Sequence, residues 1–386
     1  MVAYAGGISS LSLAFFVWFD ILNDMKGLSF PVFKTKTAGV TQSFRLEDPV
    51  ERRKYFELKA GAEIEKLREY LRTSTFVGIL LGPKNSGKGT YTKLFMEAMG
   101  SEADRVAHVS VGDIVRGVHK DFADPGGKER LMNFLKSRYR GFIPLDKFQD
   151  IVEGRDQKTH LPTEIILALI EREIDRIGRK AIFIDGFPRN LDQVSFSLYF
   201  RAIIGYRDDP DFFAFIDVPE AVIDERMKFR VVCPTCQSPR NTKLLRTRDA
   251  GYDYEKKEFY LLCDNPNCAG FANARMVSKE GDELGIEAIR GRIETEANVM
   301  KTIAELQGVP KVYLRNSIPA ERAKDFVDDY EITPAYRYEL DATTAEVKVI
   351  EEPWTVKDDG GVWSYSLLPA PVAVALIKQV AGVLGL

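Results

Sequence analysis

Residues 78–90 read Gly-Ile-Leu-Leu-Gly-Pro-Lys-Asn-Ser-Gly-Lys-Gly-Thr, and this stretch decides the fold. Its apolar start predicts a buried strand, and Leu94, Phe95 and Ala98 then recur at helical spacing. Between strand and helix, the pattern G-x₄-G-K lets successive backbone N–H groups turn toward phosphate oxygens at the positive end of a helix. The Lys88 ammonium would reach the β- and γ-phosphates. The residues expected to hold the nucleotide are Gly82, Asn85, Ser86, Gly87, Lys88, Gly89 and Thr90.

Further apolar runs predict the sheet around this loop. The runs are Phe76–Leu81, Val106–Ser110, Ala181–Asp185 and Phe212–Asp217. Such continuous runs suit parallel strands that are buried on both faces, so we expect an α/β fold with a doubly wound parallel sheet of five strands. Two segments compete for the fifth strand, 311–314 and 363–367. We favour 363–367, because the final helix follows it directly.

Composition excludes some classes of protein. The chain of 386 residues is 45% hydrophobic and 29% charged, which is typical of a globular protein that buries a core. Its 54 basic and 57 acidic side chains leave a net charge of -3. A nucleic-acid binder normally carries a basic excess, so we expect no nucleic-acid partner.

The first residues contain the one candidate targeting segment, Leu11–Phe19. Nine residues, all apolar except Ser12, are too few to cross a bilayer, and no Lys or Arg precedes Lys26 to make the basic start of a secretory signal. An alternative is that translation begins at Met25. Either interpretation predicts a cytoplasmic protein with no membrane partner.

Four cysteines fall within one short region and indicate a metal site. Cys233 and Cys236 form one pair, and Cys263 and Cys268 form a second pair with a wider gap. Clustered pairs of this kind favour a metal site over a disulfide framework. Four thiolates suit a closed, tetrahedral Zn²⁺ site with a structural role. Iron, or free redox-active thiols, are the alternatives.

Together with the phosphate loop, three later segments resemble adenylate kinases in the same order along the chain. The loop ends in Gly-Lys-Gly-Thr, as is typical of that family. Residues 110–116 (Ser-Val-Gly-Asp-Ile-Val-Arg) and 185–189 (Asp-Gly-Phe-Pro-Arg, with Gln193 following) are similar to the family's two acceptor motifs. Residues 217–230 (Asp-Val-Pro onward) are similar to the segment that enters the family's lid.

The resemblance implies a role for each matching residue. Asp185 would orient Mg²⁺ through water, and Arg226 and Arg230 would serve the donor nucleotide, one near its adenine and one at its phosphates. A further Arg in the helix after the lid would close on the phosphates, either Arg290 or, preferably, Arg292. The residues implied at the AMP site are Val111, Arg116, Gly186, Arg189 and Gln193.

These residue types suit phosphoryl transfer, because its loose transition state needs fixed positive charge more than covalent chemistry. Arginine supplies a bidentate fork that lysine cannot mimic. Two departures stand out: Val111 replaces the family's Thr beside the AMP base, and Lys279 stands where a lid Arg is expected.

The resemblance also divides the chain and names its partners. The expected parts are an N-terminal helical extension (1–73), core (74–110), AMP-binding insertion (111–165), core (166–230), zinc lid (231–281), core helix (282–307), β-rich hairpin insertion (308–361), and final strand with C-terminal helix (362–386). We expect a monomer that binds ATP, AMP and Mg²⁺. Asn190 also fits the UMP/CMP kinases, which therefore remain an alternative. A non-catalytic zinc-ribbon nucleotide-binding module is a second one.

Overall fold

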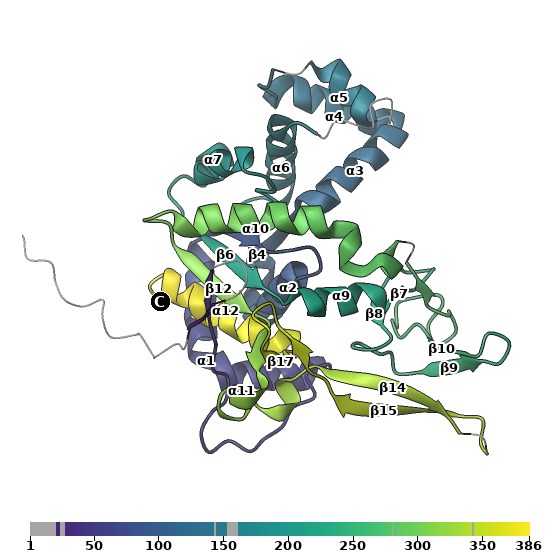
Figure 1. The fold of residues 1–386 in the computed structure, drawn as a ribbon. Coiled ribbons are helices and arrows are strands. Elements are labelled where there is room, and N and C mark those ends of the chain that lie inside the picture. Colours follow the sequence, from purple (N-terminus) through teal and green to yellow (C-terminus); the bar gives the residue numbers. More distant parts are fainter. Residues whose placement is uncertain (1–20, 24–27, 143, 153–160, 280, 342) are drawn as a thin grey trace, which may run out of the picture.

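The computed structural model describes residues 21–23, 28–142, 144–152, 161–279, 281–341 and 343–386. Its centre is a five-stranded sheet in the order β12-β6-β3-β5-β4, in which all neighbours are parallel (Figure 1). This is the α/β sheet that the sequence predicts. The strands are β3 (Val77–Leu81), β4 (Val106–Ser110), β5 (Ala181–Asp185), β6 (Asp211–Asp217) and β12 (Lys311–Arg315).

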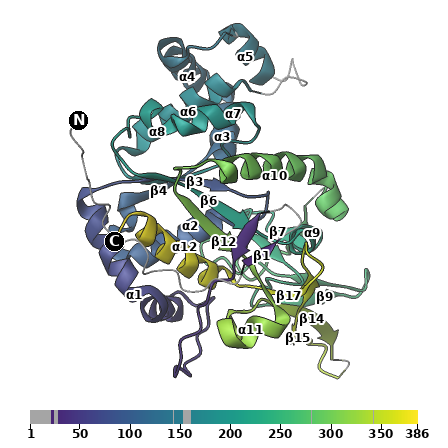
Figure 2. The same cartoon turned by 60° about the vertical axis from the view of Figure 1, so that its left-hand side comes forward.

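Helices cover both faces of the sheet, as its apolar strands require. One face packs against α1, α2 and α12, and the other against α6, α7, α8 and α10 (Figure 2). The helices are α1 (Pro49–Thr73), α2 (Lys88–Met99), α6 (Thr163–Ile177), α7 (Asp192–Leu198), α8 (Phe200–Ile203), α10 (Arg290–Glu305) and α12 (Pro369–Val383).

The identity of the fifth strand corrects our prediction. β12 fills the edge beside β6, whereas β17 (Trp363–Ser366) pairs antiparallel with two short strands in a separate sheet. The reason lies in the burial of β17. Trp363 is 55% exposed, while Ser364 and Ser366 face inward and are fully buried. A strand that presents serines to the interior forms hydrogen bonds there and cannot fill the apolar layer of a doubly wound sheet.

Two insertions leave the carboxyl ends of core strands. After β4, the helices α3, α4 and α5 build a small apolar core with α6 around Leu131, Leu135 and Phe148. After β6, α9 leads into five short strands whose connecting loops carry the cysteines, and the 3-10 helix η2 returns the chain to α10. The bounds are α3 (Val111–Ala123), α4 (Pro125–Arg138), α5 (Leu145–Val152), α9 (Glu220–Lys228), β7 (Arg230–Val232), β8 (Pro239–Asn241), β9 (Ala250–Asp253), β10 (Glu258–Leu261), β11 (Val277–Ser278) and η2 (Asp282–Ile289). A further 3-10 helix, η1 (Gly100–Arg105), joins α2 to β4.

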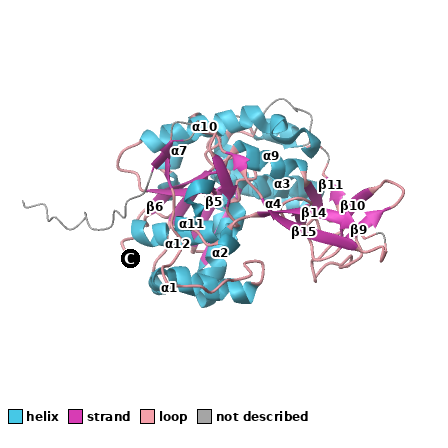
Figure 3. Ribbon diagram, turned by 60° about the horizontal axis from the view of Figure 1, so that its bottom comes forward, coloured by secondary structure: helices cyan, strands magenta, loops and turns pink. Residues whose placement is uncertain are grey.

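A third insertion separates β12 from α12, and it contains the hairpin that the sequence indicates. We call residues 317–366 the late insertion. Its hairpin lies beside β9, a strand between the two cysteine pairs (Figure 3). Its elements are β13 (Ser317–Pro319), α11 (Ala320–Phe326), η3 (Asp329–Glu331), β14 (Pro334–Leu340), β15 (Val347–Pro353), β16 (Val356–Lys357) and β17.

Two hydrogen bonds and a ring contact are among the interactions that join the hairpin to the cysteine region (residues 231–279). The Tyr336 N–H donates to the Lys243 carbonyl (2.7 Å), and the Tyr338 hydroxyl donates to the Thr242 carbonyl (2.8 Å). The rings of Tyr338 and Phe259 are stacked with their centroids 5.8 Å apart. The late insertion thus supports the cysteine region from one side.

The N-terminal extension packs against the late insertion through a buried polar cluster. Glu331 is fully buried and accepts hydrogen bonds from the Thr35 (2.6 Å) and Tyr55 (2.5 Å) hydroxyls. Nearby, the buried Lys59 ammonium binds Asp328 at 2.8 Å and the Thr35 carbonyl at 2.9 Å. Residues far apart in sequence therefore satisfy one another's charges away from water.

The extension also contributes a small ribbon of β1 (Ile21–Asn23) and β2 (Ser29–Pro31), and β2 lies near β12. The predicted apolar segment Leu11–Phe19 lies outside the described residues. None of the described helices combines the length and the apolar character that crossing a membrane requires.

Candidate active site

The phosphate loop joins β3 to α2, and its backbone is suited to surround an anion. Asn85 (φ 67°) and Gly87 (φ 99°) adopt left-handed conformations. A Cβ on Gly87 would lie 2.8 Å from the Tyr91 ring, so only glycine fits there. The Lys88 ammonium donates to the carbonyls of Gly82 (2.7 Å) and Pro83 (3.0 Å), and burial lowers its pKa. Such a desolvated cation interacts strongly with a phosphate.

Asp185 stands opposite Lys88 at the carboxyl end of β5. Its Oδ1 is 3.6 Å from the Lys88 Nζ, and its side chain is largely buried. A small cavity lies between α10 and the carboxyl ends of β3 and β5, and its charged lining consists of Lys88, Asp185, Arg189, Arg292 and Glu296. Positive charge predominates here, which suits a polyphosphate.

Arg189 and Arg116 converge near the start of α3. A Cβ on Gly112 would lie 3.4 Å from Nη1 of Arg116 and 3.7 Å from Nη2 of Arg189. Gly186 (φ 87°) lies closer still, because a Cβ there would be 2.8 Å from Nη2 of Arg189. The buried Nε of Arg189 has no hydrogen-bond partner among the described residues. Burial, together with the nearby Arg292, lowers the pKa of Arg189.

Arg226 and Arg230 both reach the phosphate loop from the segment that precedes the cysteines. Nη1 of Arg226 donates to the Asn85 carbonyl (3.2 Å), and Nη1 of Arg230 donates to Oδ1 of Asn85 (3.3 Å). Arg230 also forms a bidentate pair with Asp282 at 2.5 and 2.6 Å. Arg226 instead binds the neutral side chain of Asn316 (3.0 Å).

The surroundings of Arg290 and Arg292 show which of the two lies at the phosphate cavity. Arg292 lines the cavity beside Lys88 and is held by Glu296, whose Oε1 accepts from its Nε at 2.7 Å. Arg290 instead pairs with Glu287 and Glu220. Arg292 therefore has the position expected of the closing arginine.

Lys279 lies near the phosphate loop, since its charge acts on Lys84. Burial lowers the pKa of Lys84, and the cations of Arg230, Arg292 and Lys279 lower it further.

The implied acceptor-base residues are both buried. Val111 is 1% exposed and Gln193 is 4% exposed. The Gln193 Oε1 accepts from the Arg189 backbone N–H (2.8 Å), and its Nε2 donates to the Thr163 hydroxyl (3.2 Å). Gln193 thus connects the loop that carries Arg189 to the start of α6, and it would have to exchange a partner to bind a base.

Sequence reasoning missed Asn316 and Glu296, which hold two of the arginines. Asn316 directly follows β12, and polar residues at the carboxyl ends of parallel strands are a recognised signal of a ligand site. That signal was lost because the wrong segment was preferred as the fifth strand. Glu296 carries no comparable signal, since it follows Arg292 at an ordinary helical spacing.

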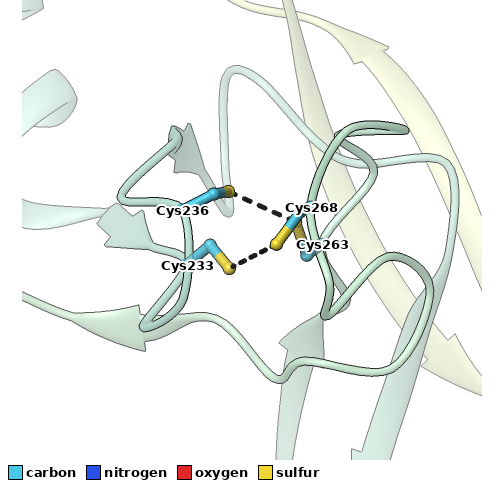
Figure 4. A group of neighbouring side chains, drawn as sticks. All are labelled: Cys233, Cys236, Cys263 and Cys268. Atoms are coloured by element: carbon cyan, nitrogen blue, oxygen red, sulfur yellow. Dashed lines mark hydrogen bonds between the residues drawn. The ribbon is translucent and has the colours of Figure 1, made fainter.

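The four cysteines meet at one point although they come from distant turns (Figure 4). Their sulfurs all lie within 4.8 Å of one another, with Cys233 to Cys268 at 3.8 Å and Cys236 to Cys263 at 3.7 Å. A disulfide needs about 2 Å. Zn–S bonds of about 2.3 Å in a tetrahedron separate the sulfurs by about 3.8 Å. The sulfur positions therefore fit a tetrahedral ion, and the Gly270 N–H donates to Cys268 Sγ (3.3 Å) as an outer partner.

The fold and the loop define a P-loop nucleotide-binding protein with insertions at the ligand edge of its sheet. No protein-family model matches the chain. The chain is 30% identical over 182 residues to an adenylate kinase of Clostridium novyi. This match covers 47% of this chain and 71% of the relative. The chain is 31% identical over 159 residues to the adenylate kinase of Clostridium acetobutylicum, and 28% to that of Thermotoga neapolitana. These two matches each cover 41% of this chain and 60% of the relative. The chain belongs to the adenylate kinase family.

Proposed function

We propose that the protein is an adenylate kinase, which transfers the terminal phosphoryl group of ATP to AMP and gives two ADP. The observation that carries the proposal is the cavity at the carboxyl edge of the sheet, where Lys88, Arg189 and Arg292 surround one small volume beside Asp185. These fixed cations suit the charge that spreads over the oxygens of the transferred group. The adenylate kinase relatives support the same chemistry.

On the donor side, the backbone of residues 82–90 and the Lys88 ammonium would hold the ATP phosphates. Arg226 and Arg230 would approach the donor nucleotide, one near its adenine and one at its phosphates, from the segment that precedes the cysteines, because both already touch Asn85. Mg²⁺ prefers carboxylate and water oxygens, and Asp185 offers such an oxygen beside the phosphate loop. Bound there, Mg²⁺ would neutralise phosphate charge.

On the acceptor side, Arg116 and Arg189 would clamp the AMP phosphate. The two guanidinium groups lie next to each other over Gly112. The apolar Val111 would pack against the base, and Gln193 would read its edge after releasing Thr163.

We further propose that the cysteines hold structural Zn²⁺, with iron as the alternative. Four thiolates leave no open position for catalysis, so the ion would order the lid (231–281) and the lid would exclude water from the phosphates. The division of the chain given above, with Lys311–Arg315 in place of 363–367 as the last core strand, belongs to the same proposal, as do a monomeric state and a cytoplasmic location.

The decisive experiment measures ADP formation from Mg²⁺-ATP with AMP, CMP, UMP and GMP in turn. We expect transfer to AMP, and a loss of at least about 10²-fold in kcat/KM for Lys88→Ala, because a donor to the transition state is removed. Lys93→Ala, an exposed lysine one turn along the same helix, is the matched control and should retain activity. Preference for CMP or UMP would assign the chain to the pyrimidine branch. Absence of transfer to all four acceptors would contradict a kinase.

A further inference from the structure

Asn316 occupies the point where the chain leaves the core sheet for the late insertion. It is fully buried and follows β12 directly. Its backbone N–H donates to the Asp217 carbonyl, and its carbonyl accepts from the Leu367 N–H, both at 2.9 Å. Leu367 is the residue at which the chain returns from the late insertion. The two ends of the insertion are therefore joined at Asn316.

The side chain of Asn316 has a defined orientation. Its Nδ2 donates to the Leu367 carbonyl (2.9 Å), so its Oδ1 faces the opposite way. This oxygen accepts from Nη2 of Arg226 (3.0 Å) and from the Ser366 hydroxyl (2.9 Å). Both amide groups thus have partners that match them, as a buried amide requires.

Arg226 is consequently held between two neutral oxygens. Asn316 binds its Nη2, and the Asn85 carbonyl in the phosphate loop binds its Nη1. The buried Tyr91 hydroxyl lies beside the pair. Hydrogen bonding with Arg226 and Asn316 opposes the effect of burial, which raises the pKa of Tyr91.

The neighbouring Arg230 shows what a different partner would do. Asp282 binds Arg230 with both carboxylate oxygens and so cancels most of its charge locally. A neutral amide orients a guanidinium through a hydrogen bond without cancelling its charge. Arg226 therefore stays positioned and keeps its attraction for an anion at the phosphate loop.

We propose that Asn316 is a positioning residue, which aims the Arg226 guanidinium at the donor nucleotide and leaves its charge available. The proposal rests on the donor role proposed above for Arg226. It also gives the point where the chain returns from the late insertion a function, because the Leu367 carbonyl fixes the amide that orients this arginine.

The test measures steady-state kinetics and, separately, ATP binding by calorimetry for Asn316→Ala and Asn316→Asp. Both variants should raise the KM and the Kd for ATP about tenfold, and the KM for AMP should stay within about twofold. Asp retains the acceptor oxygen for Arg226 but cancels the charge of that arginine and loses the Nδ2 donor to the Leu367 carbonyl. A role in packing alone therefore predicts that the KM values of ATP and AMP change together in this variant, whereas the proposal predicts a change for ATP. Ser366→Ala removes the other donor to the same oxygen and should leave the KM for ATP unchanged.

A double-mutant cycle with Arg226→Ala completes the test. Because Asn316 acts through Arg226, the double variant should bind ATP no more weakly than Arg226→Ala alone. The proposal would be overturned if the two single substitutions weakened ATP binding independently, so that their factors multiplied in the double variant. Equal changes in the KM values of ATP and AMP in the Asn316 variants would also overturn it. Absence of phosphoryl transfer by the wild type would refute the proposed function alone, because the cycle can still be measured as ATP binding. If Asn316→Ala does not fold, Asn316→Asp is compared with Ser366→Ala instead. The proposal then requires a higher KM for ATP in Asn316→Asp than in Ser366→Ala.

Discussion

At the scale of single residues, Gly186 shows how closely the backbone constrains a functional side chain. Its left-handed φ of 87° disfavours any residue with a Cβ, and that Cβ would lie 2.8 Å from Nη2 of Arg189. We expect Gly186→Ala to displace the guanidinium and lower kcat/KM for transfer about 10²-fold, since misplacement by about 1 Å has effects of this size.

Two other glycines supply the controls for Gly186→Ala. Gly205 has a similar φ of 77° but open space around its Cβ position, and Gly117 has open space without a positive φ. Gly205→Ala should lower stability by about 1–2 kcal/mol without changing kcat. Gly117→Ala, in the interior of α3, should raise stability by about 0.5–1 kcal/mol and also leave kcat unchanged. Equal losses of activity in the two left-handed variants would show that backbone strain, not Arg189, is responsible.

Glu331 gives a pH dependence of stability whose sign can be worked out. Burial raises its pKa above the ordinary 4.5, although hydrogen bonds from Thr35 and Tyr55 oppose this. The folded state then holds the proton more tightly than the unfolded chain. The free energy of unfolding should fall as the pH rises from about 4.5 through the raised pKa, and then level off.

Urea unfolding between pH 4.5 and 8 checks this prediction with Glu331→Gln. The variant should lose the decline attributed to Glu331, so its stability relative to the wild type should improve as the pH rises. Glu321→Gln, on the neighbouring α11 and exposed, should follow the wild type. A difference between Glu331→Gln and wild type that does not vary with pH would contradict the assignment.

At the scale of elements, the β14–β15 hairpin should govern the order of the cysteine region. Tyr338→Ala removes both the stacking on Phe259 and the hydrogen bond to Thr242. An aromatic pair and a hydrogen bond together contribute roughly 2 kcal/mol, so hydrogen exchange of residues 242–261 should accelerate at least about tenfold. Tyr338→Phe retains the ring and should show a smaller effect.

Arg337→Ala is the matched control on the same strand. Arg337 pairs with Glu339 and Glu352, within the hairpin itself. Its removal should leave exchange in the cysteine region unchanged. Acceleration in Arg337→Ala equal to that in Tyr338→Ala would mean that the hairpin, and not its contact with the cysteines, had been disturbed.

The elements also show what the sequence could predict. β3 and β5 lie within the apolar runs that predict them, because strands buried on both faces leave an unbroken pattern. The argument that the last core strand directly precedes the last helix favours β17 over β12 as the fifth strand of the sheet. The alternation Trp-Ser-Tyr-Ser of β17 contradicted that choice, since Ser364 and Ser366 need polar partners. Asp358, the partner of Ser364, is near in sequence, but Asn316, the partner of Ser366, is 50 residues away and visible only in the fold.

For the site, the sequence predicted the residues that lie on contiguous motifs, such as Lys88, Asp185 and Arg189. The structure places these around one cavity. The sequence could not predict which groups orient the arginines. Asp282 binds Arg230 from 52 residues away, and Asn316 binds Arg226 from 90 residues away. Pairing over such separations depends on topology and leaves no local pattern.

At the scale of the whole molecule, the metal site should make one region conditionally folded. The cysteine region has only a small apolar cluster, around Val231, Leu261 and Met276, so metal binding on the order of 10 kcal/mol would dominate its stability. We expect one Zn²⁺ per chain by elemental analysis, and less than about 0.1 in Cys263→Ala.

Hydrogen exchange separates this local loss from global unfolding. In Cys263→Ala, protection should disappear from residues 233–278 and persist in β3, β5 and β6, which belong to the separate core of the sheet. A chelator should reproduce this pattern in the wild type and add nothing in the variant. Retention of full metal content by Cys263→Ala would contradict the four-cysteine assignment.

The buried Glu331 cluster has a consequence for how such a chain could arise. Thr35, Tyr55 and Lys59 come from the N-terminal side, whereas Asp328 and Glu331 come from the late insertion. Acquisition of either part alone would leave a lysine or a carboxylate stranded in an apolar setting. The N-terminal extension and the late insertion should therefore occur together in evolution. Relatives that lack one of these two segments should lack the other as well, or carry uncharged residues at the positions of Lys59, Asp328 and Glu331.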